Sequence, residues 1–178
     1  MATERRIVRR FVSSAPEATE ALGAALGGAL APGTVVALDG DLGSGKTCLV
    51  RGLARGLGVE GPVTSPTYAL LQTYAGRLEL HHFDAWMEGR ERAFLLDGGD
   101  VSFGSDGVAV VEWAGRVAEF LPAPRLWIGL EHRGVDRRAI TLAVEDEAGA
   151  HAAPGPAARA LAELARSVPP IAGLADVP

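Results

Sequence analysis

Two patterns of hydrophobic residues open the chain, one typical of a strand and one of a helix. Residues 7–12 predict a first strand, and leucines spaced four apart over 22–30 predict one face of a helix. Ser14 and Glu17 have the S-x-x-E spacing of a capping box. We therefore expect this helix to begin beside Ser14 and to end at Gly33.

A second strand and a second helix flank a glycine-rich turn. Residues 34–38 form a short apolar run that predicts a buried strand, and residues 48–57 predict the helix. The later part of the chain predicts more strands than helices. Its expected elements are a hairpin of 68–74 and 77–83, a short helix over 88–96, a glycine-rich loop over 98–107, a buried strand over 108–111 and final strands over 125–131 and 139–145. This order predicts a P-loop NTPase-like α/β fold, a mixed sheet flanked by helices.

The composition changes after Gly149, where alanine and proline dominate. Apolar residues at helical spacing over 157–168 predict one short amphipathic helix. Because proline-flanked segments of this kind are usually loosely attached, we expect a domain over 1–149 and a tail over 150–178.

Charge and cysteine content narrow the class of protein. Net charge is −5 and the sequence pI is about 5.4, which argues against a broad nucleic-acid-binding surface. The basic stretch 5–10 is expected to be a solvated strand edge. Cys48 is the single cysteine, so no internal disulfide can form and a cytoplasmic location is expected. The N-terminus lacks the apolar region of a signal peptide.

Lys46 is the one lysine among 17 basic residues, and it lies in a full match to G-x-x-x-x-G-K-[ST] over residues 40–47. In such a loop, backbone N–H groups surround phosphates, the lysine reaches the β- and γ-phosphates, and the hydroxyl binds Mg²⁺. A glycine-rich turn with a solvated lysine is the alternative. The motif predicts that the chain binds a nucleoside triphosphate and Mg²⁺; that the nucleotide is ATP is implied only by the family resemblance given below. The predicted nucleotide-binding residues of the loop are Leu42, Gly43, Ser44, Gly45, Lys46 and Thr47.

Three residues outside the loop are candidates for the same site. Glu112 ends the strand over 108–111, where an acidic residue would hold Mg²⁺ together with Thr47; a helix-start charge is the alternative. Thr67 lies in a loop about 20 residues past Lys46, where a hydroxyl can approach the γ-phosphate, although Ser-Pro-Thr is also common turn chemistry. Asp84 ends a strand. With Lys46, these three form the predicted catalytic set.

Two histidines precede Asp84 and raise the question of a zinc site. His81 and His82 are adjacent on a strand, so their side chains point to opposite faces. We therefore favour Asp84 alone as a polar contributor near the nucleotide.

GDLGSGKT, SPTYALLQTY, HHFDAW and VVEWAGR occur in this order, and together they resemble the bacterial TsaE (YjeE) family over residues 7–145. The resemblance implies an ATPase that acts with TsaD and TsaB homologues to attach threonylcarbamoyl to adenosine 37 of tRNA, with the tRNA reached through the complex. It also implies that Trp113 lies by the nucleotide and that residues 14–19 lie near the adenine. The family usually has Leu-Tyr-Arg where this chain has Ala-Trp-Met over 85–87, so the familiar arginine is missing.

Two other functions compete with this one. A small-molecule P-loop kinase usually needs an arginine-bearing lid, but residues 98–107 contain no basic residue. A nucleotide sensor that does not hydrolyse ATP is the second. Because no arginine follows the loop in an obvious position, we expect slow hydrolysis that partners accelerate and weak tRNA binding by the isolated chain. Arginines clustered at 133, 137 and 138 could instead reach the nucleotide or a partner's RNA.

Overall fold

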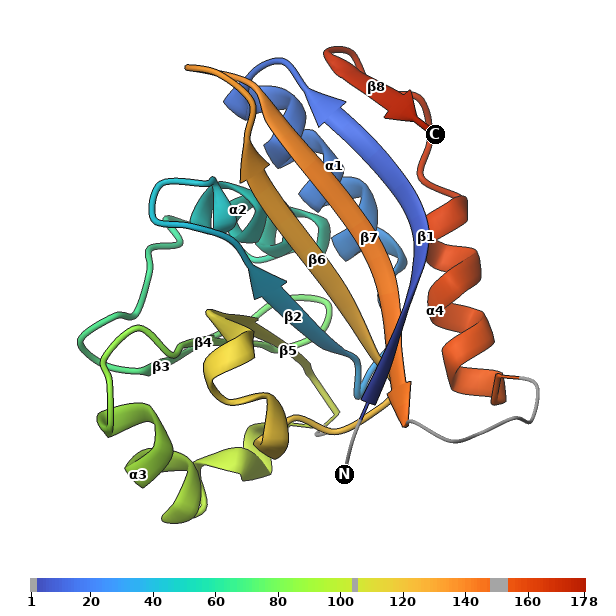
Figure 1. Ribbon diagram of the computed structural model, residues 1–178. Coiled ribbons are helices and arrows are strands. Elements are labelled where there is room, and N and C mark those ends of the chain that lie inside the picture. The colour runs from blue at the N-terminus through green and yellow to red at the C-terminus, as the bar shows by residue number, and fades with distance from the viewer. Residues whose placement is uncertain (1–2, 104–105, 148–153) are drawn as a thin grey trace.

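A computed structural model describes residues 3–103, 106–147 and 154–178. Its centre is one eight-stranded sheet with the order β3-β4-β5-β2-β6-β7-β1-β8, flanked by helices on both faces (Figure 1). The strands are β1 (Thr3–Ser13), β2 (Val35–Asp39), β3 (Leu71–Tyr74), β4 (Leu80–Asp84), β5 (Val108–Glu112), β6 (Arg125–His132), β7 (Arg138–Glu147) and β8 (Leu174–Val177). The α-helices are α1 (Pro16–Ala29), α2 (Lys46–Gly56), α3 (Arg90–Leu96) and α4 (Pro156–Arg166). Short 3₁₀ turns cover Gly99–Ser102, Ala114–Arg116 and Ala118–Phe120.

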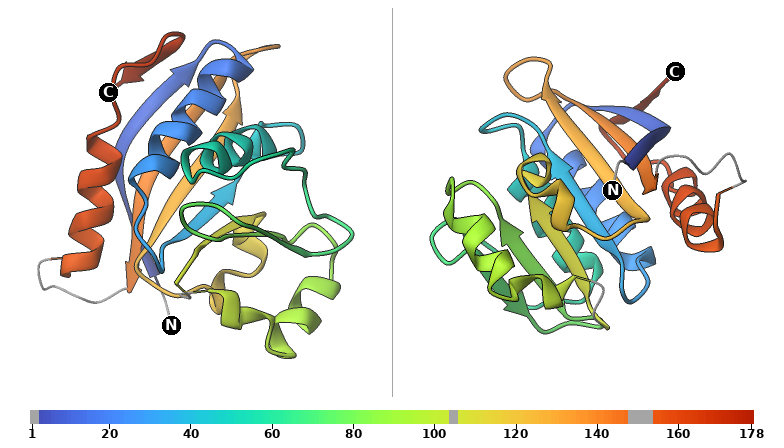
Figure 2. Two further views of the ribbon diagram at one scale, coloured as in Figure 1. Left: turned by 180° about the vertical axis from the view of Figure 1, so that it is seen from behind. Right: turned by 60° about the horizontal axis from the view of Figure 1, so that its bottom comes forward.

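The middle of the sheet is parallel. β2 lies between β5 and β6 and runs parallel to both, and β4 runs parallel to β5. Val36 and Leu38 point to the face that α1 and α2 cover, whereas Ala37 points to the face that α3 and the 3₁₀ turns cover (Figure 2). Both faces are therefore buried, which explains the continuous apolar runs in β2 and β5.

Helices α1 and α2 approach each other through glycines. A Cβ atom added to Gly52 would lie 2.0 Å from the carbonyl oxygen of Glu20, and one added to Gly23 would lie 2.3 Å from that of Leu49. Gly27 and Gly56 make equally close approaches. Because a side chain would separate the helices, these glycines fix the position of α2, and Lys46 and Thr47 stand at its N-terminus.

The start of α1 differs from the prediction. The N-cap is Ala15 with no side-chain cap, and Pro16 occupies the first turn, where its fixed φ suits a helix. Ser14 Oγ instead donates to the carbonyl of Gly173, near the C-terminus, so the predicted capping box is wrong. The helix also ends earlier, with Leu30 at its C-cap and Gly33 in the following turn.

The C-terminal segment packs against the sheet, so the expectation of a loosely attached tail is wrong. The predicted amphipathic helix exists as α4, and its Ala158, Leu161, Ala162 and Ala165 belong to the main core. An additional strand, β8, pairs antiparallel with β1. Arg9 of β1 donates to both carboxylate oxygens of Asp176 at 2.7 and 2.6 Å, which fastens β8 to the sheet.

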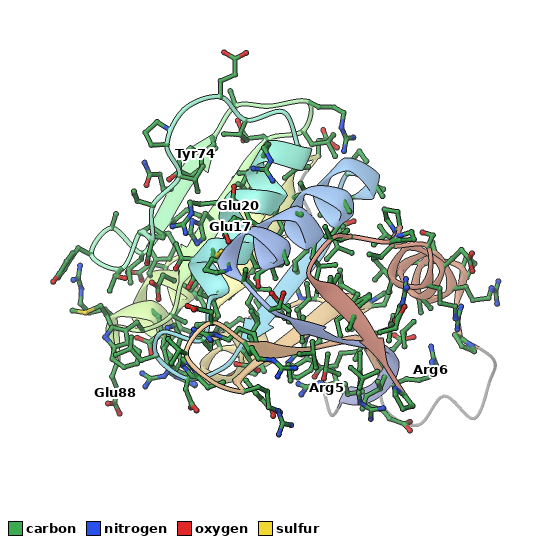
Figure 3. The ribbon with its side chains drawn as sticks, turned by 90° about the horizontal axis from the view of Figure 1, so that it is seen from above. Arg5, Arg6, Glu17, Glu20, Tyr74 and Glu88 are labelled. Atoms are coloured by element: carbon green, nitrogen blue, oxygen red, sulfur yellow. The ribbon has the colours of Figure 1, made fainter. Side chains whose placement is uncertain are left out.

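Most of the basic stretch 5–10 is covered on one edge only, because β1 pairs with β7 over Thr3–Ser13 but with β8 only over residues 10–13. Residues 4–7 are exposed, as expected for a solvated strand edge. Arg5 lies over the Trp127 ring at 3.7 Å from its centroid. In Figure 3, Glu88 lies at the lower left, Arg5 near the middle of the lower edge and Arg6 farther to the right. None of the helices within the described residues is both long and apolar enough to cross a bilayer.

Candidate functional site

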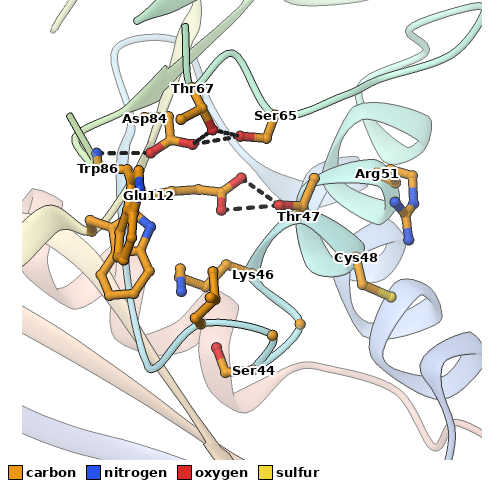
Figure 4. A pocket seen from close by; sticks show the side chains of 14 residues that line it. Ser44, Lys46, Thr47, Cys48, Arg51, Ser65, Thr67, Asp84, Trp86 and Glu112 are labelled. Atoms are coloured by element: carbon orange, nitrogen blue, oxygen red, sulfur yellow. Dashed lines mark hydrogen bonds between the residues drawn. The ribbon is translucent and has the colours of Figure 1, made fainter.

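The predicted loop lies between the end of β2 and the start of α2, as the sequence indicates. Gly40, Gly43 and Gly45 have φ angles of 145°, 73° and 103°, a region that favours glycine. A Cβ on Gly40 would also lie 2.3 Å from the carbonyl oxygen of Leu130. The loop borders an open cavity of about 430 Å³ (Figure 4). The predicted loop, catalytic and metal-binding residues and Trp113 all line this cavity: Leu42, Gly43, Ser44, Gly45, Lys46, Thr47, Thr67, Asp84, Glu112 and Trp113. Residues 14–19, expected near the adenine, are not among its lining residues.

The acidic residues meet the loop because parallel strands end at one edge of the sheet. Glu112 is in register with Leu38 of β2 on one side and with Asp84 of β4 on the other. Thr47 Oγ1 donates to the Glu112 carboxylate, 3.0 and 3.1 Å from its two oxygens. The Glu112 side chain therefore faces the phosphate loop. Its contact with Thr47 favours the metal-binding interpretation over that of a charge at the start of a helix.

His82 supports Glu112 from the side away from the cavity. The sequence analysis did not predict it as a site residue. Its Nε2 is 2.9 Å from Glu112 Oε1, and the side chain is fully buried. Residues two apart on a strand share a face, so its spacing from Asp84 was the available signal. His81 instead contacts Thr73 and Glu79.

Asp84 gathers the loop that contains Thr67. Its Oδ2 accepts hydrogen bonds from Thr67 Oγ1, at 2.7 Å, and from Ser65 Oγ. Its Oδ1 accepts from the backbone N–H of Trp86 at 2.9 Å. Thr67 and Asp84, both in the predicted catalytic set, thus belong to one hydrogen-bond network with Ser65. Ser65 also lines the cavity but was not in the predicted set.

Lys46 is only 5% exposed, so the alternative of a solvated lysine is wrong. Its Nζ donates to the carbonyl oxygens of Gly40 at 2.7 Å and Asp41 at 3.0 Å, and lies 3.7 Å from the centroid of the Trp113 ring. Burial lowers the pKa of Lys46, against the opposing effect of nearby carboxylates, first that of Glu112. The ammonium is thus held by neutral acceptors that a phosphate could replace.

The Ala-Trp-Met segment over 85–87 places a second tryptophan, Trp86, in the cavity wall. Trp86 and Trp113 rings lie 4.5 Å apart at a tilt of 46°. Arg116 donates to the Trp86 carbonyl at 3.1 Å and lies 5.7 Å from the Trp113 ring centroid. Arg92, in α3, forms an ion pair with Glu119.

Arg51, which the sequence analysis did not single out, lines the cavity beside Cys48 (Figure 4). Arg51 was missed because it lies one helical turn past the loop, where only the position of α2 brings it to the cavity wall. Burial raises the pKa of the Cys48 thiol, so this cysteine is not an activated nucleophile.

The donor set fits a phosphate and a magnesium ion. Within the described residues, Ser44 Oγ is buried without a hydrogen-bond partner, inside the loop that motif analysis assigns to phosphates. Those residues contain no cluster of three or more His, Cys, Asp or Glu that could hold a metal alone. Thr47 and Glu112 offer the sparse oxygen set that suits Mg²⁺, which usually keeps water and phosphate ligands.

A strand, a glycine-rich loop and a helix, with acidic residues ending the neighbouring strands, define a P-loop NTPase-like α/β protein. Residues 13–140 match the family model described as threonylcarbamoyl adenosine biosynthesis protein TsaE. The chain belongs to this family.

Individual relatives agree with the family match. The tRNA threonylcarbamoyladenosine biosynthesis protein TsaE of Treponema pallidum (strain Nichols) is 41% identical over 134 residues, 75% of this chain and 99% of that protein. The protein of the same name from Bacillus subtilis (strain 168) is 41% identical over 127 residues, 71% of this chain and 79% of that one. A solved structure described as Bacillus subtilus YdiB has a TM-score of 0.71 at 31% identity, covering 93% of this chain and 97% of that chain.

Proposed function

We propose that this protein binds and hydrolyses Mg·ATP and that this activity is needed for threonylcarbamoylation of adenosine 37 in tRNA. The observation that carries the proposal is the meeting of Lys46, Thr47, Glu112 and Asp84 around one cavity, at the ends of three parallel strands. The names of the relatives place those proteins in tRNA threonylcarbamoyladenosine biosynthesis, which supports the choice of pathway.

Each residue has a distinct role in this proposal. Lys46 exchanges its carbonyl partners for phosphate oxygens, and the loop amides receive the rest of the negative charge. Thr47 and Glu112 would hold Mg²⁺, which neutralises charge on the phosphates during transfer. Asp84, already bonded to Thr67 and Ser65, orients this loop toward the transferred phosphoryl group.

We propose further that TsaD and TsaB homologues are the partners and that they bring the tRNA. The net charge of −5 supports this division of work, because a surface with few excess cations gains little counterion-release affinity for RNA. Arg138 lies under the loop and not at the cavity wall, and Arg133 pairs with Glu131, so neither supplies a free cation to the phosphates.

The pathway is tested in cells that lack the chromosomal copy of this protein and express a plasmid copy. Wild-type protein should restore threonylcarbamoyladenosine in tRNA, measured by mass spectrometry of nucleosides, whereas Lys46→Met at equal abundance should not. Restoration by both proteins would contradict a role for the phosphate loop. Restoration by neither would contradict the pathway.

A further inference from the structure

The turn between β6 and β7 lies against the outer side of the phosphate loop, opposite the cavity. Arg138, the first residue of β7, is not among the cavity-lining residues. Its Nε donates to the carbonyl of Ser44 at 2.9 Å, and its Nη2 donates to that of Gly43 at 3.3 Å. One guanidinium therefore holds two successive peptide groups of the loop.

The third nitrogen of the same guanidinium holds the hairpin turn. Nη1 of Arg138 donates to the carbonyls of Gly134 at 3.3 Å, Val135 at 3.1 Å and Arg137 at 2.9 Å. Each of these hydrogen bonds ends on a carbonyl oxygen, and within the described residues no carboxylate forms an ion pair with Arg138. The side chain is thus committed to connecting the hairpin with the loop.

The contact of Arg138 with the loop carbonyls also orients the loop N–H groups on the cavity side. Across a trans peptide, the C=O of one residue and the N–H of the next point in opposite directions. When the Gly43 and Ser44 carbonyls are held toward β7, the N–H groups of Ser44 and Gly45 point to the inside of the loop. There the Ser44 N–H meets the carbonyl of Asp41 at 3.1 Å, on the same side as the Lys46 ammonium.

A second contact from the hairpin acts on the preceding peptide. His132 Nε2 lies 3.3 Å from the carbonyl oxygen of Leu42, which by the same geometry directs the Gly43 N–H inward. Three consecutive carbonyls, those of Leu42, Gly43 and Ser44, are therefore held from outside by β6 and β7. Glycines at 43 and 45 can adopt many backbone conformations. The contacts from β6 and β7 therefore reduce the conformational entropy of this stretch.

We propose that Arg138 is a positioning residue for phosphate binding, which presets the N–H groups of Ser44 and Gly45 toward the phosphates. The inference rests on the proposed nucleotide binding and adds to it a residue outside the cavity. Arginine is required because its planar fork can span two carbonyls, whereas an ammonium is a single point charge. The positive charge beneath the loop also favours the bound phosphates.

The test compares Arg138→Gln, Arg138→Lys and Arg137→Gln in the full chain. Arg137→Gln is the matched control, because it removes the same charge one residue away. Calorimetric titration with Mg·ADP should show about tenfold weaker binding for Arg138→Gln, the loss expected for charge-assisted hydrogen bonds. Arg138→Lys should show a smaller but clear loss, and Arg137→Gln should bind within about twofold of wild type.

A second readout separates positioning from charge and from misfolding. In ligand-free protein, the ¹⁵N–¹H resonances of Ser44 and Gly45 should move in Arg138→Gln and stay in place in Arg137→Gln. Resonances of the distant β8 should not move in either variant. Full affinity in Arg138→Gln, full rescue by Arg138→Lys, or unmoved loop resonances would each overturn the inference. Wild-type protein that binds no nucleotide would instead overturn the proposed function.

Discussion

At the scale of single residues, the site is organised by buried polar groups that already have partners. Lys46 rests on two carbonyls and a tryptophan ring, Thr47 donates to Glu112, and His82 supports Glu112 from behind. Because an unpaired buried polar group is costly, these bonds hold the side chains in place before a ligand arrives. In the proposed function, nucleotide binding would exchange these partners for phosphate and metal ligands, with the side chains already in place.

Replacing Lys46 by methionine should weaken nucleotide binding while leaving the fold intact. Methionine keeps most of the apolar stem but loses the ammonium that lies over the Trp113 ring. We expect affinity for Mg·ATP to fall by about tenfold to a hundredfold, measured by titration, with a thermal midpoint close to wild type. Lys46→Arg should also be impaired, because a planar guanidinium does not fit a point-charge site. Tight binding by folded Lys46→Met would contradict the assignment.

Glu112→Gln should affect turnover more than binding. The amide keeps the shape and can still meet Thr47 and His82, but it lacks the charge that orders Mg²⁺. We expect kcat for ATP hydrolysis to fall about a hundredfold, with nucleotide affinity changed by only a few-fold. Glu119→Gln, at an exposed carboxylate that does not line the cavity, is the control. Equal kcat for Glu112→Gln and wild type at saturating Mg·ATP would refute the metal role.

At the scale of elements, the contact between α1 and α2 determines where the loop's helix lies. Alanine substitutions at a close and at an open glycine test this contact. Gly52→Ala would place a methyl group 2.0 Å from the Glu20 carbonyl oxygen, so the helices must separate, at a cost of about 3 kcal/mol or more in the free energy of unfolding.

The matched control is Gly28→Ala in α1, whose nearest neighbour would lie 3.9 Å away. It should stabilise the protein by about 0.5–1 kcal/mol, because alanine is the better helix former. Urea denaturation measures both values. A Gly52→Ala variant as stable as wild type would show that the helix contact is not as close as described.

Elements with a strong period were predictable from the sequence, whereas contacts between distant segments were not. β2, β5 and α2 follow from apolar runs and the motif, and the predicted site residues converge because strand ends share an edge. The sequence of β8 has no alternation over Leu174–Val177, and it is a strand only because it pairs with β1 and Asp176 meets Arg9. The contact of Arg138 with Ser44 spans 94 positions in the chain, so no local pattern contains it.

At the scale of the whole molecule, a buried ion pair joins the strands of the antiparallel half. Arg125 of β6 donates to the Glu145 carboxylate of β7 at 3.1 Å, and Thr3 of β1 donates to it at 2.6 Å. Burial alone would raise the pKa of Glu145, but the hydrogen bonds from Thr3 and Arg125 outweigh it and lower the pKa below its ordinary value of 4.5.

This shift predicts a defined loss of stability in acid. Since the folded pKa lies below the unfolded one, Glu145 contributes stability above pH 4.5, and the contribution disappears as pH falls through the folded pKa. Glu145→Gln should cost about 3 kcal/mol at pH 7, because it leaves Arg125 buried and unpaired. In urea denaturation, the difference from wild type should shrink as the pH falls below 4.5 and through the folded pKa. Glu119→Gln, which breaks an exposed pair with Arg92, should cost less than about 1 kcal/mol. A difference independent of pH would contradict the account.

We propose above that this chain is a Mg·ATPase whose partners accelerate it. The most direct measurement is steady-state phosphate release from Mg·ATP by the purified protein, alone and with its TsaD and TsaB homologues, with Lys46→Met in parallel. We expect slow hydrolysis by the isolated chain, because Arg116 is bonded to the Trp86 carbonyl and Arg51 lies beside Cys48 on α2, and a marked increase when both partners are added. Lys46→Met should stay at background in every mixture. Rapid hydrolysis by the isolated chain, or none above the Lys46→Met background with both partners present, would contradict the claim.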